Sequence, residues 1–311
     1  MKTEYFEFIS ENTRLSAVLW LPDDEVTLVT QITHGMTEHI GRYEAYAEFM
    51  TACGGAVCGF DLRGHGKSGS GEVASFGEGG WQLCLKDMRN FFEQMKARFP
   101  DTTYVMMGFS LGSFLLREYL GLYPDGVDGA VIVGTGYQPA WVLSLMKAIV
   151  KAECKKVGFD HTSPLIRKLS FETYNQQFRP CQTDFDWLCS DERERSAYME
   201  DPLCRKQISA GLFWQLLDSM GRTGKRNAAA AWAKGTSVLL LSGACDPVGN
   251  SGKGVRKVMK RLQKVGFRGA KMKLIPHARH DVLHETSVPQ YDQVRECLRE
   301  FNANCVLLSL I

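Results

Sequence analysis

A glycine-flanked serine, Gly108-x-Ser110-x-Gly112, constrains the fold more than any other feature of the sequence. It follows an apolar run, Val105–Met107, whose length and β-branched start favour a buried strand. It precedes a second run, residues 114–120, with the broad apolar face of a helix. The pattern therefore predicts a strand, a sharp turn and a helix, with the serine hydroxyl exposed on the turn.

Steric crowding explains why glycine is required at positions 108 and 112. We expect a strained backbone at Ser110, and the positions two before and two after it lie where strand and helix nearly touch. The start of the following helix also offers free N–H groups that favour negative charge beside the serine. This is the arrangement of a nucleophile; the alternative is a glycine-rich turn with an incidental serine.

The composition of the chain excludes several classes of protein. At 311 residues, the chain has room for one large α/β domain with an insertion. A formal net charge of +2 makes no electrostatic case for nucleic acid or an anionic membrane as partner. The start of the chain lacks a signal-peptide pattern, and no apolar run reaches the roughly 18 residues of a spanning helix, so we expect a cytoplasmic protein.

The ten cysteines are scattered and form no C-x-x-C pair. This spacing does not favour a zinc site or a thioredoxin-like motif. We expect reduced thiols that serve as small core residues.

Strand and helix patterns alternate along most of the chain. Residues 4–10 and 14–21 are expected to form an antiparallel pair. Further strands are predicted at 26–33, 56–60, 127–133, 237–241 and 271–275, and helices at 42–52, 80–98, 251–265 and 288–302. This alternation favours a mostly parallel sheet with helices on both faces.

The alternation stops after Val133 and resumes about 100 residues later at Ser237. A crossover needs only about a dozen residues or more, so the excess implies an insertion of roughly 70–80 residues. The insertion is helical in pattern and rich in aromatic residues. We predict an insertion at 136–218 within a core formed by 1–135 and 219–311.

A serine nucleophile needs a base within hydrogen-bond reach and a third group that orients the base. In open α/β sheets such groups lie at the carboxyl ends of strands. Asp246 follows the strand predicted at 237–241, and His280 follows the strand at 271–275. With the chain order Ser, Asp, His, we predict Ser110, Asp246 and His280 as the catalytic residues.

Alternatives exist for the acid and for the base. Asp246 also suits an Asx turn before the proline that follows it. His277 and His284 are rivals of His280, but His277 is too close to the strand end, and we expect His284 on the next helix. Asp281 is expected to cap that helix.

Developing negative charge on the substrate oxygen needs N–H donors. The backbone N–H of Leu111, directly after the serine, is one candidate, and that of Met36 is the second. Gly35 is expected to let the backbone turn tightly beside Met36.

Five motifs follow one another along the chain. They are His34-Gly35-Met36-x-Glu38-His39-x-Gly41-Arg42-Tyr43, Asp61-x-Arg63-Gly64-His65-Gly66-x-Ser68, Gly108-x-Ser110-x-Gly112-Ser113, Gly243-x-x-Asp246 and Arg279-His280-Asp281. In these motifs the chain resembles the monoacylglycerol lipase and lysophospholipase group of serine α/β-hydrolases. The resemblance implies an α/β-hydrolase fold: a mostly parallel, eight-stranded sheet with helices on both faces and a helical cap over the active site. It also implies a Ser110–His280–Asp246 triad, no cofactor or metal, and ester substrates with acyl chains.

The resemblance is thin across the insertion, which leaves the substrate open, and Cys245 has no derived role. Six polar residues of the first two motifs suggest either a second active centre or, preferably, a network that braces the oxyanion loop. They are Glu38, His39, Arg42, Asp61, Arg63 and His65.

The segment Trp141–Lys151 predicts a helix that is apolar over most of its surface, with polar residues at 144, 147 and 151 only. It suits a buried cap helix, which we favour, a wall of an acyl pocket, or a lid that transiently touches lipid surfaces. The mixed charges of Asp191–Arg195 predict a solvated face.

These observations predict a serine hydrolase that cleaves lipid-like or monoacyl carboxylic esters through an acyl-enzyme on Ser110, with a small acyl ester as its partner. One alternative is an aminopeptidase of the same fold, which an acidic cluster facing the pocket would favour. A non-catalytic ligand-binding receptor is the other, and the intact Ser, His and Asp set argues against it.

Overall fold

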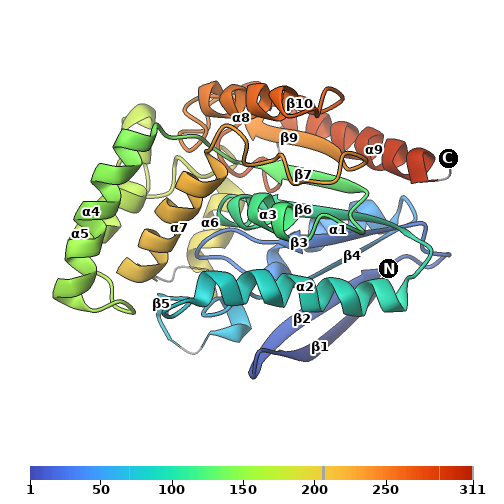
Figure 1. The fold of residues 1–311 in the computed structure, drawn as a ribbon, viewed down its shortest axis with the longest axis horizontal. Coiled ribbons are helices and arrows are strands. Elements are labelled where there is room, and N and C mark those ends of the chain that lie inside the picture. The colour runs from blue at the N-terminus through green and yellow to red at the C-terminus, as the bar shows by residue number, and fades with distance from the viewer. Residues whose placement is uncertain (70, 205–206, 287, 310–311) are drawn as a thin grey trace.

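The computed structural model describes residues 1–311 except 70, 205–206, 287 and 310–311. Its centre is an eight-stranded sheet with the order β1-β2-β4-β3-β6-β7-β9-β10 (Figure 1). Strand β2 is antiparallel to β1 and to β4, and all other neighbours are parallel. The predicted fold class is confirmed.

The strands of this sheet lie close to the predicted ranges. They are β1 (Lys2–Ser10), β2 (Thr13–Leu21), β3 (Leu28–Thr33), β4 (Gly55–Phe60), β6 (Thr103–Phe109), β7 (Gly129–Val133), β9 (Ser237–Gly243) and β10 (Lys271–Ile275). Every residue of β3, β4, β6 and β7 is buried. Because helices cover both faces of these central strands, apolar runs such as Val105–Met107 are continuous instead of alternating.

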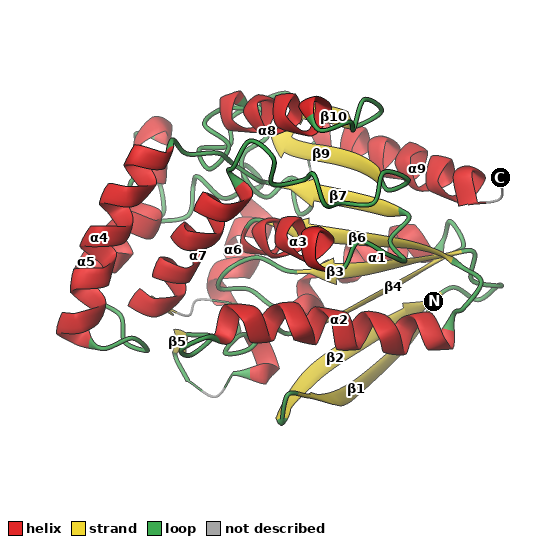
Figure 2. Cartoon of the chain, viewed as in Figure 1, coloured by secondary structure: helices red, strands yellow, loops and turns green. Residues whose placement is uncertain are grey.

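Helices cover both faces of the sheet (Figure 2). One face carries α2 (Gly80–Arg98), α3 (Leu111–Leu122) and α8 (Lys253–Lys264), and the other carries the 3₁₀ turn η1 (Ile40–Tyr43), α1 (Glu44–Thr51) and α9 (Gln290–Ser309). Successive residues of β6 point to opposite faces, so that Met106 packs in the core cluster of α2 and α3, and Met107 in that of α1 and α9.

The chain between β7 and β9 is mainly helical and lies beyond the carboxyl ends of the parallel strands in Figure 1. It contains α4 (Ala140–Val157), α5 (Pro164–Arg167), the turns η3 (Lys168–Glu172) and η4 (Tyr174–Phe178), α6 (Glu192–Glu200), β8 (Gln207–Ile208) and α7 (Ala210–Thr223). Strand β8 pairs with β5 (Val73–Ala74), which follows the 3₁₀ turn η2 (Gly66–Ser68).

Helix α7 joins this segment to the core. It packs on both α4 and α3, and Gln215 accepts a hydrogen bond from the N–H of Trp81 at 2.8 Å. The helix continues without a break across residue 218, where we predict the insertion to end. The division of the chain at that residue remains a prediction.

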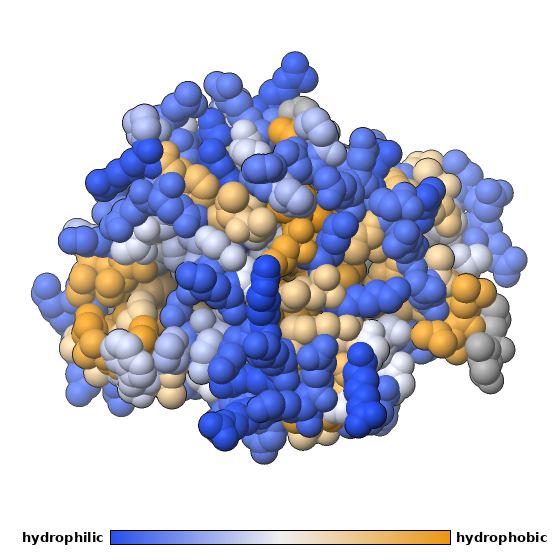
Figure 3. Space-filling view, turned by 90° about the horizontal axis from the view of Figure 1, so that it is seen from above, coloured by the Kyte–Doolittle hydropathy of each residue, from blue (hydrophilic) through white to orange (hydrophobic). Residues whose placement is uncertain are grey.

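Helix α4 is buried on one side only. Leu143 and Val150 are buried, but Trp141, Leu145 and Ile149 are 72%, 57% and 40% exposed. These three residues are four apart, so they form one stripe along the helix. The favoured interpretation of a buried cap helix is therefore wrong for this side, and Figure 3 shows apolar surface at the end of the molecule where α4 lies.

The prediction of a solvated face at 191–195 is only partly right. Asp191 is buried and caps α6 by accepting from the N–H groups of Arg193 and Glu194. Arg195 is buried beside Asp186, 3.5 Å away, while residues 192 and 193 are exposed. Capping and an ion pair remove two of these charges from solvent, which the order of charges along the chain does not reveal.

Among the helices of the described chain, none has both the length and the apolar character that crossing a bilayer requires.

Candidate active site

Ser110 lies on the turn from β6 to α3 with φ 51° and ψ −115°, a conformation that L-residues rarely adopt. A Cβ atom on Gly108 would lie 2.4 Å from the carbonyl oxygen of Gly112, and one on Gly112 would lie 2.1 Å from that of Thr33. Both the strained serine and the steric need for the glycines are confirmed. Since the neighbouring backbones leave no space, larger residues at 108 or 112 would push α3 off the sheet.

The structure brings the three predicted catalytic side chains together. His280 Nε2 lies 2.9 Å from Ser110 Oγ, and His280 Nδ1 lies 2.9 Å from Asp246 Oδ1. His280 is 1% exposed, and Asp246 is fully buried. The three residues come from loops after β6, β9 and β10, at the carboxyl edge of the sheet, where such groups converge in α/β folds.

The environment of His280 sets its affinity for a proton. Burial acts to lower the pKa of the ring, but the charge of Asp246 and its hydrogen bond outweigh burial and raise the pKa above 6.5. The rings of Phe109 and Trp187 lie on the imidazole, with centroids 5.0 and 5.2 Å away. The histidine is therefore held in place by packing as well as by its acid.

Asp246 takes both roles that its sequence context suggests. Its Oδ1 accepts from the N–H of Val248 at 2.8 Å, which is the Asx turn, and also faces His280. Its Oδ2 accepts from Ser242 Oγ at 3.0 Å. The adjacent Cys245 contributes main-chain contacts, and its carbonyl accepts from Gln177 Nε2 of the inserted segment at 2.7 Å.

The rival histidines lie elsewhere. His277 is exposed, with φ 63°. His284 precedes α9 instead of lying on it; its Nδ1 is 2.7 Å from Asp281 Oδ1, and its Nε2 is 2.9 Å from the carbonyl oxygen of Arg42. The prediction that Asp281 caps a helix is wrong, because this carboxylate is buried and also binds Arg42 Nη2 at 3.1 Å.

Glu38 organises the loop after β3. Its carboxylate accepts from the N–H of Gly35 at 2.5 Å and from the hydroxyl of Tyr43 at 2.8 Å, and it pairs with Arg42. Arg42 thus joins Glu38 to Asp281, whose pKa is lowered because the charges of His284 and Arg42 outweigh the opposing effect of burial.

The residues proposed as oxyanion donors lie beside Ser110. Leu111 is the next residue and begins α3, and Met36 lines the same small cavity as Ser110. The positive φ of this loop is at Thr37 (63°) and not at Gly35. Gly35 is needed for close approach, because a Cβ there would lie 2.8 Å from Glu38 Oε1. The donor roles of Met36 and Leu111 remain predictions.

The other polar residues of the first two motifs also act as braces. Asp61 accepts from the N–H groups of Ile40 and Lys67 at 2.8 and 2.7 Å. His39 Nε2 lies 2.7 Å from Asp201 Oδ2 of the inserted segment. Arg63 binds Asp87 of α2 and Thr13 of β2, so it ties together core elements and not the oxyanion loop. His65 Nδ1 lies 2.9 Å from the carbonyl oxygen of Arg63.

Two groups of side chains within the described residues have the spacing of metal ligands: His39, Asp201 and Cys204, and Glu38, Asp281 and His284. In the second group, Arg42 already supplies a cation to both carboxylates. In the first, Cys204 is fully buried, and burial raises the pKa of its thiol, which opposes the thiolate that a metal needs.

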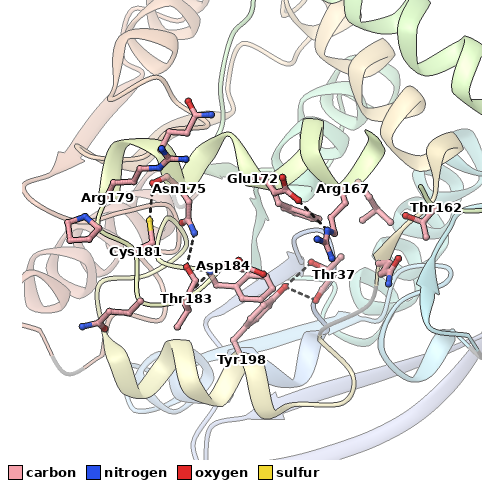
Figure 4. Close-up of a pocket in the computed structure, with 17 residues that line it drawn as sticks. Thr37, Thr162, Arg167, Glu172, Asn175, Arg179, Cys181, Thr183, Asp184 and Tyr198 are labelled. Carbon is pink, nitrogen blue, oxygen red and sulfur yellow. Dashed lines mark hydrogen bonds and ion pairs between the residues drawn. The ribbon is translucent and has the colours of Figure 1, made fainter. Parts of the chain in front are cut away.

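The space around Ser110 has two parts. A cavity of about 30 Å³ contains Ser110, His280, Met36 and Trp187, and it has room for little more than a water molecule. A cleft of about 990 Å³ opens beside it (Figure 4). Thr37, Phe171 and Tyr198 line both spaces, so these residues stand between the cleft and the serine.

The sequence did not single out the residues that join the inserted segment to the site. The hydroxyl of Tyr198 lies 2.8 Å from Thr37 Oγ1, and the ring of Trp187 packs at a tilt against that of His280. The many aromatic residues of this segment indicated that it packs against other parts of the chain, but the residues they contact lie far away in the sequence.

Residues 24–287 match the model of the family described as serine aminopeptidase, S33, which covers more than half of the chain. The chain belongs to this family. A monoacylglycerol lipase from Mycolicibacterium smegmatis is 26% identical over 278 residues, 86% of each chain. A monoglyceride lipase from Mus musculus is 23% identical over 86% of this chain and 84% of its own.

Solved structures agree on the fold. A carboxyl esterase from Bacillus coagulans has a TM-score of 0.86 at 21% identity and covers 98% of this chain and 99% of its own. A monoglyceride lipase from Saccharomyces cerevisiae has a TM-score of 0.73 at 16% identity, over 97% and 95% of the two chains. The expected resemblance to serine α/β-hydrolases of the monoacylglycerol lipase group is confirmed.

Proposed function

We propose that this member of the family is a serine hydrolase of carboxylic esters, with monoacyl or other lipid-like esters as substrates. The observation on which the proposal rests is the distance of 2.9 Å between Ser110 Oγ and His280 Nε2, together with the buried carboxylate of Asp246 on the far side of the ring. This is the geometry of an activated serine with an oriented base.

The proposed reaction has two halves. Ser110 Oγ attacks the ester carbonyl while His280 Nε2 takes its proton, and the N–H groups of Leu111 and Met36 donate to the oxygen that becomes negative. The alcohol leaves with the proton from His280, and the acyl group stays on Ser110. A water molecule, deprotonated by the same imidazole, then releases the acid and restores the serine.

Asp246 serves this cycle without changing its own charge. It holds the Nδ1–H of His280 and stabilises the positive ring that forms at each proton transfer. Its bonds from Ser242 and Val248 fix its carboxylate, so the histidine has one orientation open to it. Asp246 therefore keeps Nε2 directed at the serine throughout the cycle.

An aminopeptidase is the second candidate, because the family description names that activity. Such an enzyme needs uncompensated acidic groups near the serine to hold an α-ammonium group. The cleft has two acidic residues, Glu172 and Asp184, and two arginines, and Arg167 Nε lies 3.3 Å from Glu172. This balance favours esters, as do the names of the lipase relatives.

A panel of substrates tests the proposal. We expect p-nitrophenyl butyrate and monoacylglycerols to be hydrolysed, and aminoacyl amides to be left intact. Ser110→Ala is expected to lower ester turnover by roughly 10⁶-fold without changing the melting temperature. Turnover of esters by this variant at the parent rate would refute the role of Ser110, and preference for aminoacyl amides would favour the peptidase.

We also propose that the inserted segment acts as a cap and that the stripe of Trp141, Leu145 and Ile149 on α4 touches lipid surfaces that hold the substrate. Exposed lysines on the same helix, at 151, 155 and 156, suit the polar headgroups around such a stripe.

Vesicle binding tests this contact. Burying a large apolar side chain is worth about 1.5–3 kcal/mol, so Trp141→Ser is expected to weaken binding to phosphatidylcholine vesicles roughly 10-fold or more. Leu307→Ser, at an exposed apolar position of α9, is the matched control and should bind as the parent does. Equal losses in both variants would show that α4 has no special part in binding.

A further inference from the structure

The cleft beside Ser110 is polar, which does not suit an acyl chain. Eleven of the 17 residues that line it are Thr, Asn, Gln, Asp, Glu or Arg. Some of these groups already bind other side chains or the main chain. An alkyl chain in this space would displace water from the rest without replacing its hydrogen bonds, and each buried group left unpaired costs free energy. The lining therefore favours an occupant that both donates and accepts hydrogen bonds.

The charges of the cleft favour an uncharged occupant. Arg167 and Arg179 are matched by Glu172 and Asp184, and Arg167 is paired with Glu172. A phosphate group would meet two carboxylates as well as two arginines. Hydroxyl groups suit both kinds of side chain, because they accept from guanidinium and donate to carboxylate.

Amides and aromatic rings complete the lining. Gln176, Gln182 and Gln207 line the cleft with amide groups, which both donate and accept, although the oxygen of Gln182 already accepts from Arg195. The rings of Phe185 and Tyr198 pack edge to face, with centroids 5.2 Å apart, and give one part of the wall an apolar surface. A sugar matches both kinds of surface, because its hydroxyls can bond to the amides and the C–H groups on its faces can pack on the aromatic rings.

The size of the cleft and its position indicate which part of the substrate it holds. Its volume of about 990 Å³ is far more than a glycerol group fills. It shares Thr37, Phe171 and Tyr198 with the small cavity at Ser110. A head group in the cleft therefore places its ester bond at these three residues, next to the serine.

We propose that this cleft binds a polyhydroxyl alcohol larger than glycerol, so that the preferred substrates are acyl esters of sugars. The inference rests on the proposed esterase activity and names the alcohol on which it acts. Gln176 and Asp184, which are exposed within the cleft, are the side chains assigned to hydrogen-bond its hydroxyls. Figure 4 shows Asp184 beside Thr183, between Arg179 and Arg167.

Three esters of one acyl chain test the inference: octanoylglucose, 1-octanoylglycerol and octanoyl lysophosphatidylcholine. We expect kcat/KM of the parent protein to be at least roughly 10-fold higher for the glucose ester than for the glycerol ester, since several hydrogen bonds distinguish them. In the double variant Gln176→Ala/Asp184→Ala, this ratio is expected to fall to about one, mainly through KM of the glucose ester.

The controls separate the two proposals. The matched double variant Gln263→Ala/Asp125→Ala changes the same residue types at exposed positions of α8 and a core loop, and it should keep the parent ratio. If the melting temperature of the cleft variant drops, Arg179→Gln is measured in its place, and the same fall of the ratio is expected.

Failure of the parent to hydrolyse p-nitrophenyl butyrate would refute the esterase itself. Hydrolysis of that ester without preference for the glucose ester, or with a ratio that the cleft variants leave unchanged, would overturn the sugar subsite alone. Preference for the lysophospholipid would also overturn it and would assign a charged head group to the cleft.

Discussion

Two buried histidines, four residues apart in the loop after β10, each pair with an aspartate but have different third partners. In one, His280 Nδ1 lies 2.9 Å from Asp246, and Nε2 lies 2.9 Å from a serine hydroxyl. In the other, His284 Nδ1 lies 2.7 Å from Asp281, and Nε2 lies 2.9 Å from a backbone carbonyl oxygen, that of Arg42.

The partner at Nε2 decides what each pair is able to do. A hydroxyl both donates and accepts, so His280 has a proton to take. A carbonyl oxygen only accepts, so Nε2 of His284 must keep its proton and act as a donor. The first pair is suited to proton transfer, and the second holds the loop of His280 against the loop of Arg42, which contributes to stability.

Replacing the acid of the first pair is expected to have the largest effect. Asp246→Asn keeps the shape of the side chain but removes the charge that orients His280 and stabilises its positive form, and kcat for p-nitrophenyl butyrate should fall by roughly 10⁴-fold. The melting temperature should change far less than in a variant of Asp281. A loss of only a few-fold would mean that the two pairs do not differ in the way proposed; Asp125→Asn, on an exposed loop, is the control.

Replacing the acid of the second pair is expected to act on stability. Asp281 is fully buried and binds Arg42 and His284, so Asp281→Asn removes the buried charge that both side chains contact and leaves Arg42 with Glu38 alone. Removing one partner of a buried ion pair typically costs about 3–5 kcal/mol, and urea denaturation should show a loss of this order in the free energy of unfolding. A loss below about 1 kcal/mol would contradict the role of this pair as a brace.

The sequence identified the first pair and missed the second for a physical reason. The strand–turn–helix pattern at Ser110 and the positions of Asp246 and His280 after strands are local signals, because the carboxyl ends of parallel strands meet at one edge of a sheet. Asp281 and His284 follow the same strand as His280, but nothing in the local sequence indicates that they pair with each other and with Arg42. Their partner Arg42 is 239 residues from Asp281, and only the folded chain brings the two together.

The same limit applies to the inserted segment. Its helical character was predictable from the pattern of apolar residues, but the exposure of Trp141 depends on which side of α4 meets α7. The roles of Tyr198 and Asp201 depend on contacts with Thr37 and His39 more than 160 residues away. Local periodicity predicts that a helix forms, and long-range packing decides which of its faces are covered.

The smallest expected effect is on the pH dependence of activity, and it compares the two acids directly. In the proposed mechanism, His280 accepts a proton from Ser110 only when it is neutral, so kcat/KM should fall as the pH drops below the pKa of His280. Burial acts to lower the pKa of His280. The charge and hydrogen bond of Asp246 raise it most, and the charge of Asp281 raises it by a smaller amount, so that the pKa lies above 6.5. The acid limb of the parent profile should therefore have its midpoint above pH 6.5.

Asp246→Asn and Asp281→Asn should each move the midpoint of the acid limb to lower pH, because each removes a negative charge that favours the protonated ring of His280. The residual activity of Asp246→Asn should show the larger shift, since it loses both the hydrogen bond and the nearest charge, and Asp281→Asn the smaller one. Profiles of kcat/KM between pH 5 and 9 for the parent and both variants would measure this order. A larger shift in Asp281→Asn than in Asp246→Asn would reverse the assignment of the two pairs, because it would make Asp281 the stronger electrostatic partner of the base.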